Sequence, residues 1–219
     1  IAGRSIRNIL ESKDEGIIDS SRDAVFSGRE RHSSSRFNSL SYPQRCIRTQ
    51  QFLYIRNFKS ERWPAGPAQK FDKAKYGSNN ELLSSQLGSE HGGFHDIDAC
   101  PSLSFLIAGR DDPQLGLFLE LSVGRRPAEE LFDIRSDPSC LHNLAEKPMF
   151  EKTREQLSER LLAYLKSTDD ARVVSDDGGD IWETYPRYSG LRWFPAPDWA
   201  TQHPERVPVQ KWVDDKRPR

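Results

Sequence analysis

The sequence predicts an α+β fold: a small antiparallel β-sheet with a long C-terminal amphipathic helix packed on it, together with long irregular segments. Residues 44–58 contain two runs of β-branched and aromatic side chains separated by two glutamines, a pattern typical of an antiparallel hairpin. Residues 149–166 repeat apolar side chains at helical spacing, including Leu157, Leu161 and Leu165, with charged residues on the other face. The 14 glycines and 14 prolines indicate much irregular chain between these elements.

Weaker local patterns predict the elements before residue 110. Residues 5–13 place apolar side chains at helical spacing, and residues 24–26 fit a short strand. Residues 59–95 are rich in Pro, Gly, Asn and Ser and predict a long loop. Pro101 is expected at the first position of a helix over the next seven residues, with Asp98 capping it.

Two later segments are shorter. Residues 115–123 are apolar and fit a helix or a strand equally well. Residues 130–134 predict a strand that ends before Pro138. Asp133 and Asp137 are expected to accept backbone N–H bonds in the turn that follows.

Composition limits the classes of function. The 219 residues carry 32 basic and 33 acidic side chains, a net charge of -1, so no overall field favours nucleic acid or a membrane surface as a partner. No apolar run approaches the length that spans a bilayer. The three cysteines, Cys46, Cys100 and Cys140, are too few and too scattered for a disulfide framework.

Three consecutive stretches resemble the C-terminal subdomain of sulfatases. The first is the hairpin region, residues 42–57. The second is similar to the family's closing strand and turn, in which Glu-Leu-Tyr-Asp-Leu is followed by Asp-Pro and Asn-Leu-Ala; here the residues are Glu130-Leu131-Phe132-Asp133-Ile134, Asp137-Pro138 and Asn143-Leu144-Ala145. The third is the amphipathic helix that comes next. The resemblance covers roughly residues 20–195 and is nearest to the N-sulfoglucosamine sulfohydrolase (sulfamidase)-like members.

This resemblance implies a division of the chain. Residues 1–20 would be the end of the catalytic lobe, residues 21–167 the C-terminal subdomain, and residues 168–219 a tail rich in Trp and Pro that wraps over another surface. The tail holds four of the five tryptophans. A complete enzyme of this kind is expected to be periplasmic, secreted or lysosomal.

The chemistry of the family is expected to lie outside this chain. Sulfatases use a formylglycine made from a Cys or Ser in a Cys-x-Pro-Ser-Arg or Cys-x-Ala-Ser-Arg context, and none of the three cysteines has that context. The calcium-binding acids of the family are expected upstream of Ile1. We therefore expect no catalytic residue and no metal ligand in this chain, no cofactor of its own, and no activity when it is isolated. Its expected partners are the catalytic lobe and a sulfated glycan.

Residues 28–32 are the candidate substrate-binding segment. They follow a predicted strand and read Gly-Arg-Glu-Arg-His. The resemblance implies that His32, with Glu30 and Arg29, faces the substrate, and a guanidinium is a planar, permanently charged donor to sulfate oxygens. A solvated charged loop explains the same residues equally well.

Two other clusters have ordinary explanations. Residues 91–98 contain ligand types that suit zinc or calcium but match no established spacing, so structural roles are favoured. Arg45, Arg48 and Arg56 lie among aromatic residues on the hairpin, where they could bind a polyanion. At a net charge of -1, salt bridges to neighbouring acids are favoured.

The leading interpretation is the C-terminal fragment of a sulfatase that hydrolyses sulfate ester or N-sulfate groups of glycans. In it, this piece braces the catalytic lobe and lines the substrate pocket. The alternative is a non-catalytic module that binds a glycan or a protein, which the tryptophan-rich tail and the long loop favour.

Overall fold

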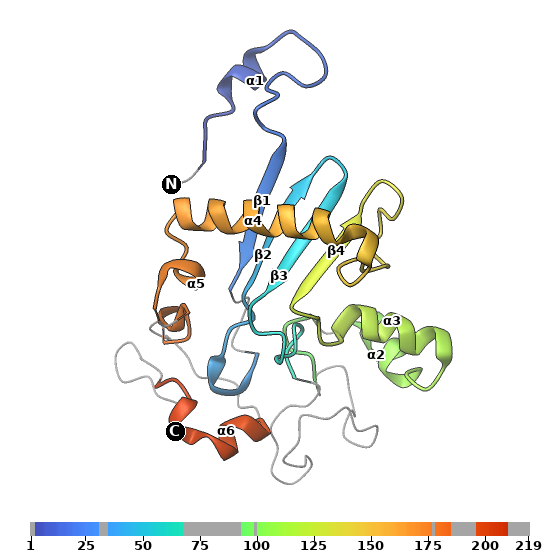
Figure 1. Ribbon diagram of the computed structural model, residues 1–219. Helices are drawn as coiled ribbons and strands as arrows, with labels where there is room; N and C mark the ends of the chain where they lie inside the picture. Colours follow the sequence, from blue (N-terminus) through green and yellow to red (C-terminus); the bar gives the residue numbers. More distant parts are fainter. Residues whose placement is uncertain are drawn as a thin grey trace.

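One antiparallel sheet of four strands organises the molecule. The computed structural model describes residues 3–30, 35–67, 93–98, 100–176, 178–184 and 196–209. The strands follow the chain order β1-β2-β3-β4 across the sheet (Figure 1). Their bounds are β1 Ala24–Arg29, β2 Gln44–Thr49, β3 Phe52–Asn57 and β4 Glu129–Asp133. The α+β class is therefore correct.

The hairpin of β2 and β3 forms as the sequence predicts. Thr49 closes its turn, because the side-chain oxygen accepts from the backbone N–H of Phe52 at 2.9 Å and from that of Gln51 at 3.3 Å. β4 then pairs antiparallel with β3, with Tyr54 opposite Leu131. This pairing joins segments that are more than seventy residues apart in the sequence.

The turn after β4 covers the outer edge of the sheet. The backbone N–H of Leu131 donates to the side-chain oxygen of Asn143 at 2.9 Å, and Leu144 donates back to the Leu131 carbonyl at 2.7 Å. Asp133 and Asp137 accept backbone N–H bonds from Arg135 and His142, as the sequence predicts. The Asn-Leu-Ala sequence thus closes one edge with side-chain and backbone groups together.

A long helix covers one face of the sheet. Helix α4 (Glu151–Ser167) runs across the strands in Figure 1 and follows the short 3-10 turn η2 (Pro148–Phe150). Its leucines at 157, 161 and 165 are buried in one cluster with Ile47, Tyr54 and Leu131, which face them from three strands. Phe26 of β1 stacks on Tyr164 with ring centroids 3.8 Å apart. The helix is not the last element, since four short helical elements follow it between residues 171 and 206.

A second apolar cluster lies beside the sheet. It is formed by α2 (Pro101–Ala108), α3 (Pro113–Val123) and Phe94, which is fully buried. Residues 115–123, which fit either structure in the sequence, are therefore helical. Pro101 does begin α2, but the N-cap is Cys100 and not Asp98, and it makes no side-chain capping bond. Asp98 is exposed because the chain enters the helix two residues beyond it.

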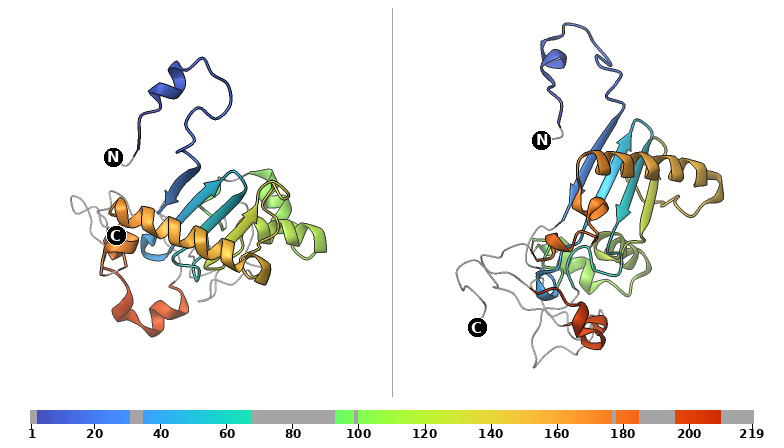
Figure 2. Two further views of the ribbon diagram at one scale, coloured as in Figure 1. Left: turned by 45° about the horizontal axis from the view of Figure 1, so that its top comes forward. Right: turned by 60° about the vertical axis from the view of Figure 1, so that its left-hand side comes forward.

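The first and last described elements lie outside the sheet layer (Figure 2). Helix α1 (Arg7–Glu11) has no buried residue and stands away from the sheet in both views of Figure 2. After α4 come α5 (Ala171–Val174), η3 (Asp180–Trp182), α6 (Asp198–Gln202) and η4 (Pro204–Arg206). A further 3-10 turn, η1 (Phe37–Ser39), lies between β1 and β2. Within the described residues, no helix has the length and apolar character needed to cross a membrane.

Two neighbouring leucines of α4 test whether the helix is held by its buried face. Leu161 is 1% exposed and Leu162 is 36% exposed. Leu161→Ala is expected to lower the free energy of unfolding by about 2–5 kcal/mol, because it leaves a cavity against the sheet. Leu162→Ala is expected to change it by less than about 1 kcal/mol. Urea unfolding measures both, and equal losses would contradict the packing of α4 on the sheet.

Candidate functional site

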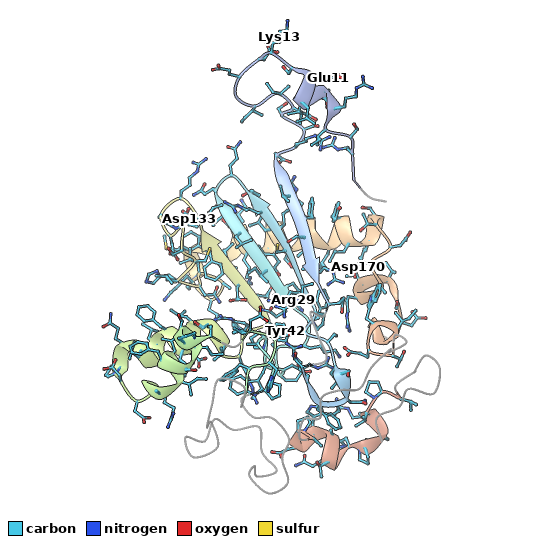
Figure 3. The ribbon with its side chains drawn as sticks, turned by 180° about the vertical axis from the view of Figure 1, so that it is seen from behind. Glu11, Lys13, Arg29, Tyr42, Asp133 and Asp170 are labelled. Carbon is cyan, nitrogen blue, oxygen red and sulfur yellow. The ribbon has the colours of Figure 1, made fainter. Side chains whose placement is uncertain are left out.

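The candidate site lies at the end of the sheet where β1 stops. Figure 3 shows Arg29 and Tyr42 together near this end of the strands, with Asp170 on the same level beside β1, whereas Asp133 lies at the opposite end. A cavity of about 340 Å³ opens between the end of β1 and the last turn of α4. Its lining consists of Phe26, Ser27, Gly28, Arg29, Glu30, Arg45, Tyr164, Leu165, Thr168 and Asp170.

A glycine in β1, Gly28, leaves space for the side chain of the buried Arg45 on the neighbouring strand. Gly28 lies opposite Arg45 in the β1–β2 ladder. A Cβ atom on Gly28 would be 2.7 Å from Cδ of Arg45, closer than van der Waals contact allows. The missing side chain therefore makes room for the Arg45 guanidinium at the edge of the cavity.

Arg45 connects two carboxylates from distant parts of the chain. Its Nη2 donates to Oε1 of Glu30 at 2.6 Å, and its Nε and Nη2 donate to the two oxygens of Asp170 at 2.6 and 3.1 Å. The contact with Asp170 is the two-pronged geometry in which a guanidinium holds a carboxylate most firmly. Asp170 also accepts from the backbone N–H of Arg172, so it caps α5 at the same time.

Arg172 extends this network into the interior. Its side chain is 0% exposed. Nε lies 3.2 Å from both oxygens of Glu30, and Nη2 donates to Oε2 of Glu30 at 2.7 Å, to Oγ of Ser41 at 2.9 Å and to Oε1 of Glu183 at 3.0 Å. Both oxygens of Glu30 are thus engaged by Arg45 and Arg172.

Glu183 is the innermost carboxylate, and its side chain is 1% exposed. It accepts from the backbone N–H of Ser41 at 2.9 Å, from the Ser41 hydroxyl at 2.8 Å and from Nη1 of Arg62 at 2.8 Å. Burial opposes its ionisation, yet the charge of Arg62 and the hydrogen bonds from Ser41 and Arg62 together lower the pKa of Glu183 to about 2. Glu183 is therefore charged at neutral pH.

A second ionic cluster adjoins the first. Asp96, whose side chain is 1% exposed, accepts from Nη2 of Arg29 and from Nη2 of Arg36, both at 2.7 Å. Arg36 also donates to the carbonyls of Trp63 and Pro64. Arg29 remains 39% exposed at its side chain. Its guanidinium therefore reaches the surface while it is held by the buried carboxylate of Asp96.

The structure brings Arg29 and Glu30 together at the cavity, while His32 lies outside the described residues. The hairpin arginines do not form one stripe. Arg45 is buried in the network, Arg48 is exposed on the other face of the sheet, and Arg56 pairs with Glu129 at 3.5 Å.

The metal-like segment, residues 91–98, is described from residue 93 onward. Asp96 pairs with two arginines, and His91 belongs to the undescribed residues. In the part of the chain that the structure describes, no three His, Cys, Asp or Glu side chains are grouped so that they could hold a metal ion.

Three residues of the network, Asp170, Arg172 and Glu183, are not predicted as site residues by any sequence pattern. They belong to the region assigned to the wrapping tail, where single charged residues look like ordinary surface positions. The separation between Glu30 and Arg172 is 142 residues, and no local pattern signals a contact over that distance. The two consecutive glycines at 178 and 179 are the one weak sequence signal of a close backbone approach in this region. The structure shows the approach: a Cβ on Gly179 would be 2.7 Å from Cδ of Arg172.

The pKa of Glu183 predicts how stability depends on pH. Its pKa falls from the usual 4.5 to about 2 on folding, so ionised Glu183 stabilises the fold above pH 4.5, and this stabilisation is lost as pH falls toward 2. The shift corresponds to about 3 kcal/mol. Glu183→Gln should therefore be less stable than wild type at neutral pH, with the difference narrowing below pH 4.5.

Urea unfolding at several pH values measures this difference. The control is Glu155→Gln, because the Glu155 side chain is 59% exposed and should give no such difference. A gap between wild type and Glu183→Gln that stays constant through the acid range would contradict the assignment.

Comparison with known proteins gives one distant relative and no family assignment. No family model matches the chain. A curated protein of Formosa agariphila described as an ulvan-active sulfatase is 23% identical over 171 residues. The match covers 77% of this chain and 25% of that protein, so the chain spans about a quarter of the length of the relative. The similarity supports a distant relationship to sulfatases.

Proposed function

We propose that this chain is the C-terminal part of a sulfatase that hydrolyses sulfate ester or N-sulfate groups of glycans. The observation that carries the proposal is the distant similarity to a sulfatase over 77% of the chain. The closing strand and turn support the proposal, because the residues that resemble the sulfatase pattern, among them Asn143 and Leu144, are hydrogen-bonded to Leu131 of β4. In this proposal the sheet, with α4 as the amphipathic helix that covers it, is the C-terminal subdomain of a sulfamidase-like member of the family.

The chain would brace the catalytic lobe and line one wall of the substrate pocket. The end of β1 is the surface proposed for the second role. The guanidinium of Arg29 lies at the cavity, where it is paired with Asp96 and still partly exposed. Such a group can hold a sulfate or a sugar hydroxyl. Glu30 would fix the chain beside it, and His32 would complete the wall.

The reaction itself would depend on residues outside this chain. In the complete enzyme, calcium and a formylglycine would supply the electrophilic metal and the nucleophile. The cysteines of this chain lack the formylglycine context, and the four acids nearest the candidate site, Glu30, Asp96, Asp170 and Glu183, are engaged in ion pairs. The contribution of this chain is therefore binding and orientation of the substrate.

The alternative proposal is a non-catalytic module that binds a glycan or a protein. Exposed apolar side chains on α2 and α3 favour it: Phe105, Leu117 and Phe118 are 62%, 56% and 43% exposed. Apolar patches of this kind often mark a contact surface.

Activity measurements separate the two proposals. The complete polypeptide that contains this chain is expected to release sulfate from an aryl sulfate or from a sulfated glucosamine in the presence of calcium. The isolated 219-residue chain is expected to be inactive, because it lacks the nucleophile. Sulfate release is measured for both after repeated purification. An inactive complete polypeptide that still binds the glycan would favour the module, and an active isolated chain would refute the fragment proposal.

A histidine pair tests the proposed pocket wall. His32→Ala in the complete enzyme should lower kcat/KM, because loss of one buried hydrogen bond costs about 1–3 kcal/mol. The matched control is His142→Ala, since the His142 side chain is 79% exposed and lies in the turn after β4. Steady-state kinetics and a thermal melt are recorded for both. Unchanged kcat/KM in His32→Ala would contradict the proposal that His32 contacts the substrate. A large fall in Tm would indicate a structural role for His32.

A further inference from the structure

The two ends of one loop meet at the centre of the ionic network. The chain leaves β1 at Glu30 and returns through Ser41 and Tyr42 before β2 begins. The backbone N–H of Tyr42 donates to the Glu30 carbonyl at 2.8 Å, so the two ends are bonded to each other. Whatever fixes Glu30 and Ser41 therefore sets the direction in which Arg29 and Glu30 face.

A single guanidinium holds both ends. Nη2 of Arg172 donates to Glu30 at 2.7 Å and to the Ser41 hydroxyl at 2.9 Å. Glu183 reinforces the second contact, because it accepts from the backbone and the hydroxyl of Ser41. Arg172 and Glu183 both come from the segment after α4, which the sequence assigns to the tail.

The charges of this network are balanced, and its innermost members, Arg172 and Glu183, are buried. Three carboxylates, Glu30, Asp170 and Glu183, are paired with three guanidinium groups, Arg45, Arg62 and Arg172. A buried network of this kind seldom adds stability over apolar side chains of the same volume. Its advantage is orientation, since each guanidinium has fixed donor directions.

We propose that Arg172, with Glu183 as its buried counter-charge, is a positioning residue for Arg29 and Glu30, and that Asp170, Arg172 and Glu183 are part of the substrate-site machinery. This inference rests on the proposed function of the Arg29–Glu30 surface. It changes the role of the segment after α4 from a covering tail to a support for the site. Arg172 acts through Glu30 and Ser41 and does not itself face the cavity.

The local backbone is shaped around Arg172. Gly179 has a φ of 85° and leaves no Cβ against the arginine side chain. Nη1 of Arg172 lies 3.4 Å from the carbonyl of Gly178. Asp170 caps the backbone at Arg172 while it holds Arg45. A lysine at 172 would keep the charge but could not contact Glu30, Ser41 and Glu183 with the same planar fork.

The first test measures loop anchoring in the 219-residue chain, where sulfatase activity is not needed. Hydrogen exchange is followed in peptides covering residues 35–43 for wild type, Arg172→Lys and Ser41→Ala. The control is Arg160→Lys, because Arg160 makes a surface pair with Asp23. Faster exchange in Arg172→Lys, with a smaller effect in Ser41→Ala and none in the control, is expected. Exchange equal to wild type in Arg172→Lys would overturn the proposal.

The second test uses the complete enzyme and separates positioning from stability. Arg172→Lys should raise KM by about tenfold or more, with a smaller change in kcat, because misdirected binding groups weaken substrate binding. Ser41→Ala, which keeps every charge, should show the same direction of change. All variants are assayed well below their melting transitions. Unchanged KM in folded Arg172→Lys, or a loss of activity proportional to the unfolded fraction, would overturn the inference.

The two tests also separate this inference from the proposed function. If the wild-type complete polypeptide releases no sulfate, the proposed function fails, and the exchange measurement alone decides whether Arg172 anchors the loop. If the wild type is active and Arg172→Lys behaves like Arg160→Lys in both tests, the proposed function stands and the positioning role is refuted.

Discussion

The buried pairing of guanidinium and carboxylate groups at the end of β1 is the constraint on which the candidate site depends. Glu30 and Glu183 meet at Arg172, and without it Glu30 would keep only Arg45, and Glu183 only Arg62, as a cationic partner. Removing one partner of such a pair typically costs about 3–5 kcal/mol. The residues come from the loop beside β1, from β2, from the chain after β3 and from the segment after α4. The network therefore requires that all four segments be in place at once.

The sheet and α4 supply the rigid platform for this arrangement. Phe26 is held against Tyr164 by ring stacking, and the next residues of β1 carry the site. The last turn of α4 ends at the cavity, and the chain then turns directly into Asp170. One apolar cluster thus fixes both the strand and the helix from which the charged groups extend. Small errors at this platform would be passed on to every contact of Arg172.

The sequence predicted the elements that carry strong periodic patterns. The hairpin and β4 were predicted from their runs of β-branched, aromatic and apolar side chains, and α4 from its apolar face at helical spacing. The turn after β4 was predicted from its Asp and Asn positions. The length of β1 was underestimated, since Ser27, Gly28 and Arg29 have low apolar character and are placed by pairing with β2. Asp98 was predicted to cap α2, but Cys100 occupies the N-cap position and makes no side-chain capping bond.

The site was predicted only where it is local. Arg29 and Glu30 were recognised within one short segment, whereas Arg172 and Glu183 required knowledge of which distant segments meet. The order of these contacts also has a kinetic consequence. The β2–β3 hairpin joins neighbours in the sequence, β4 joins it across more than seventy residues, and Arg172 reaches Glu30 across 142. Because contacts between distant residues form slowly, we expect the ionic network to be among the last structures completed as the chain folds. A nascent chain would possess its core before it possesses its site.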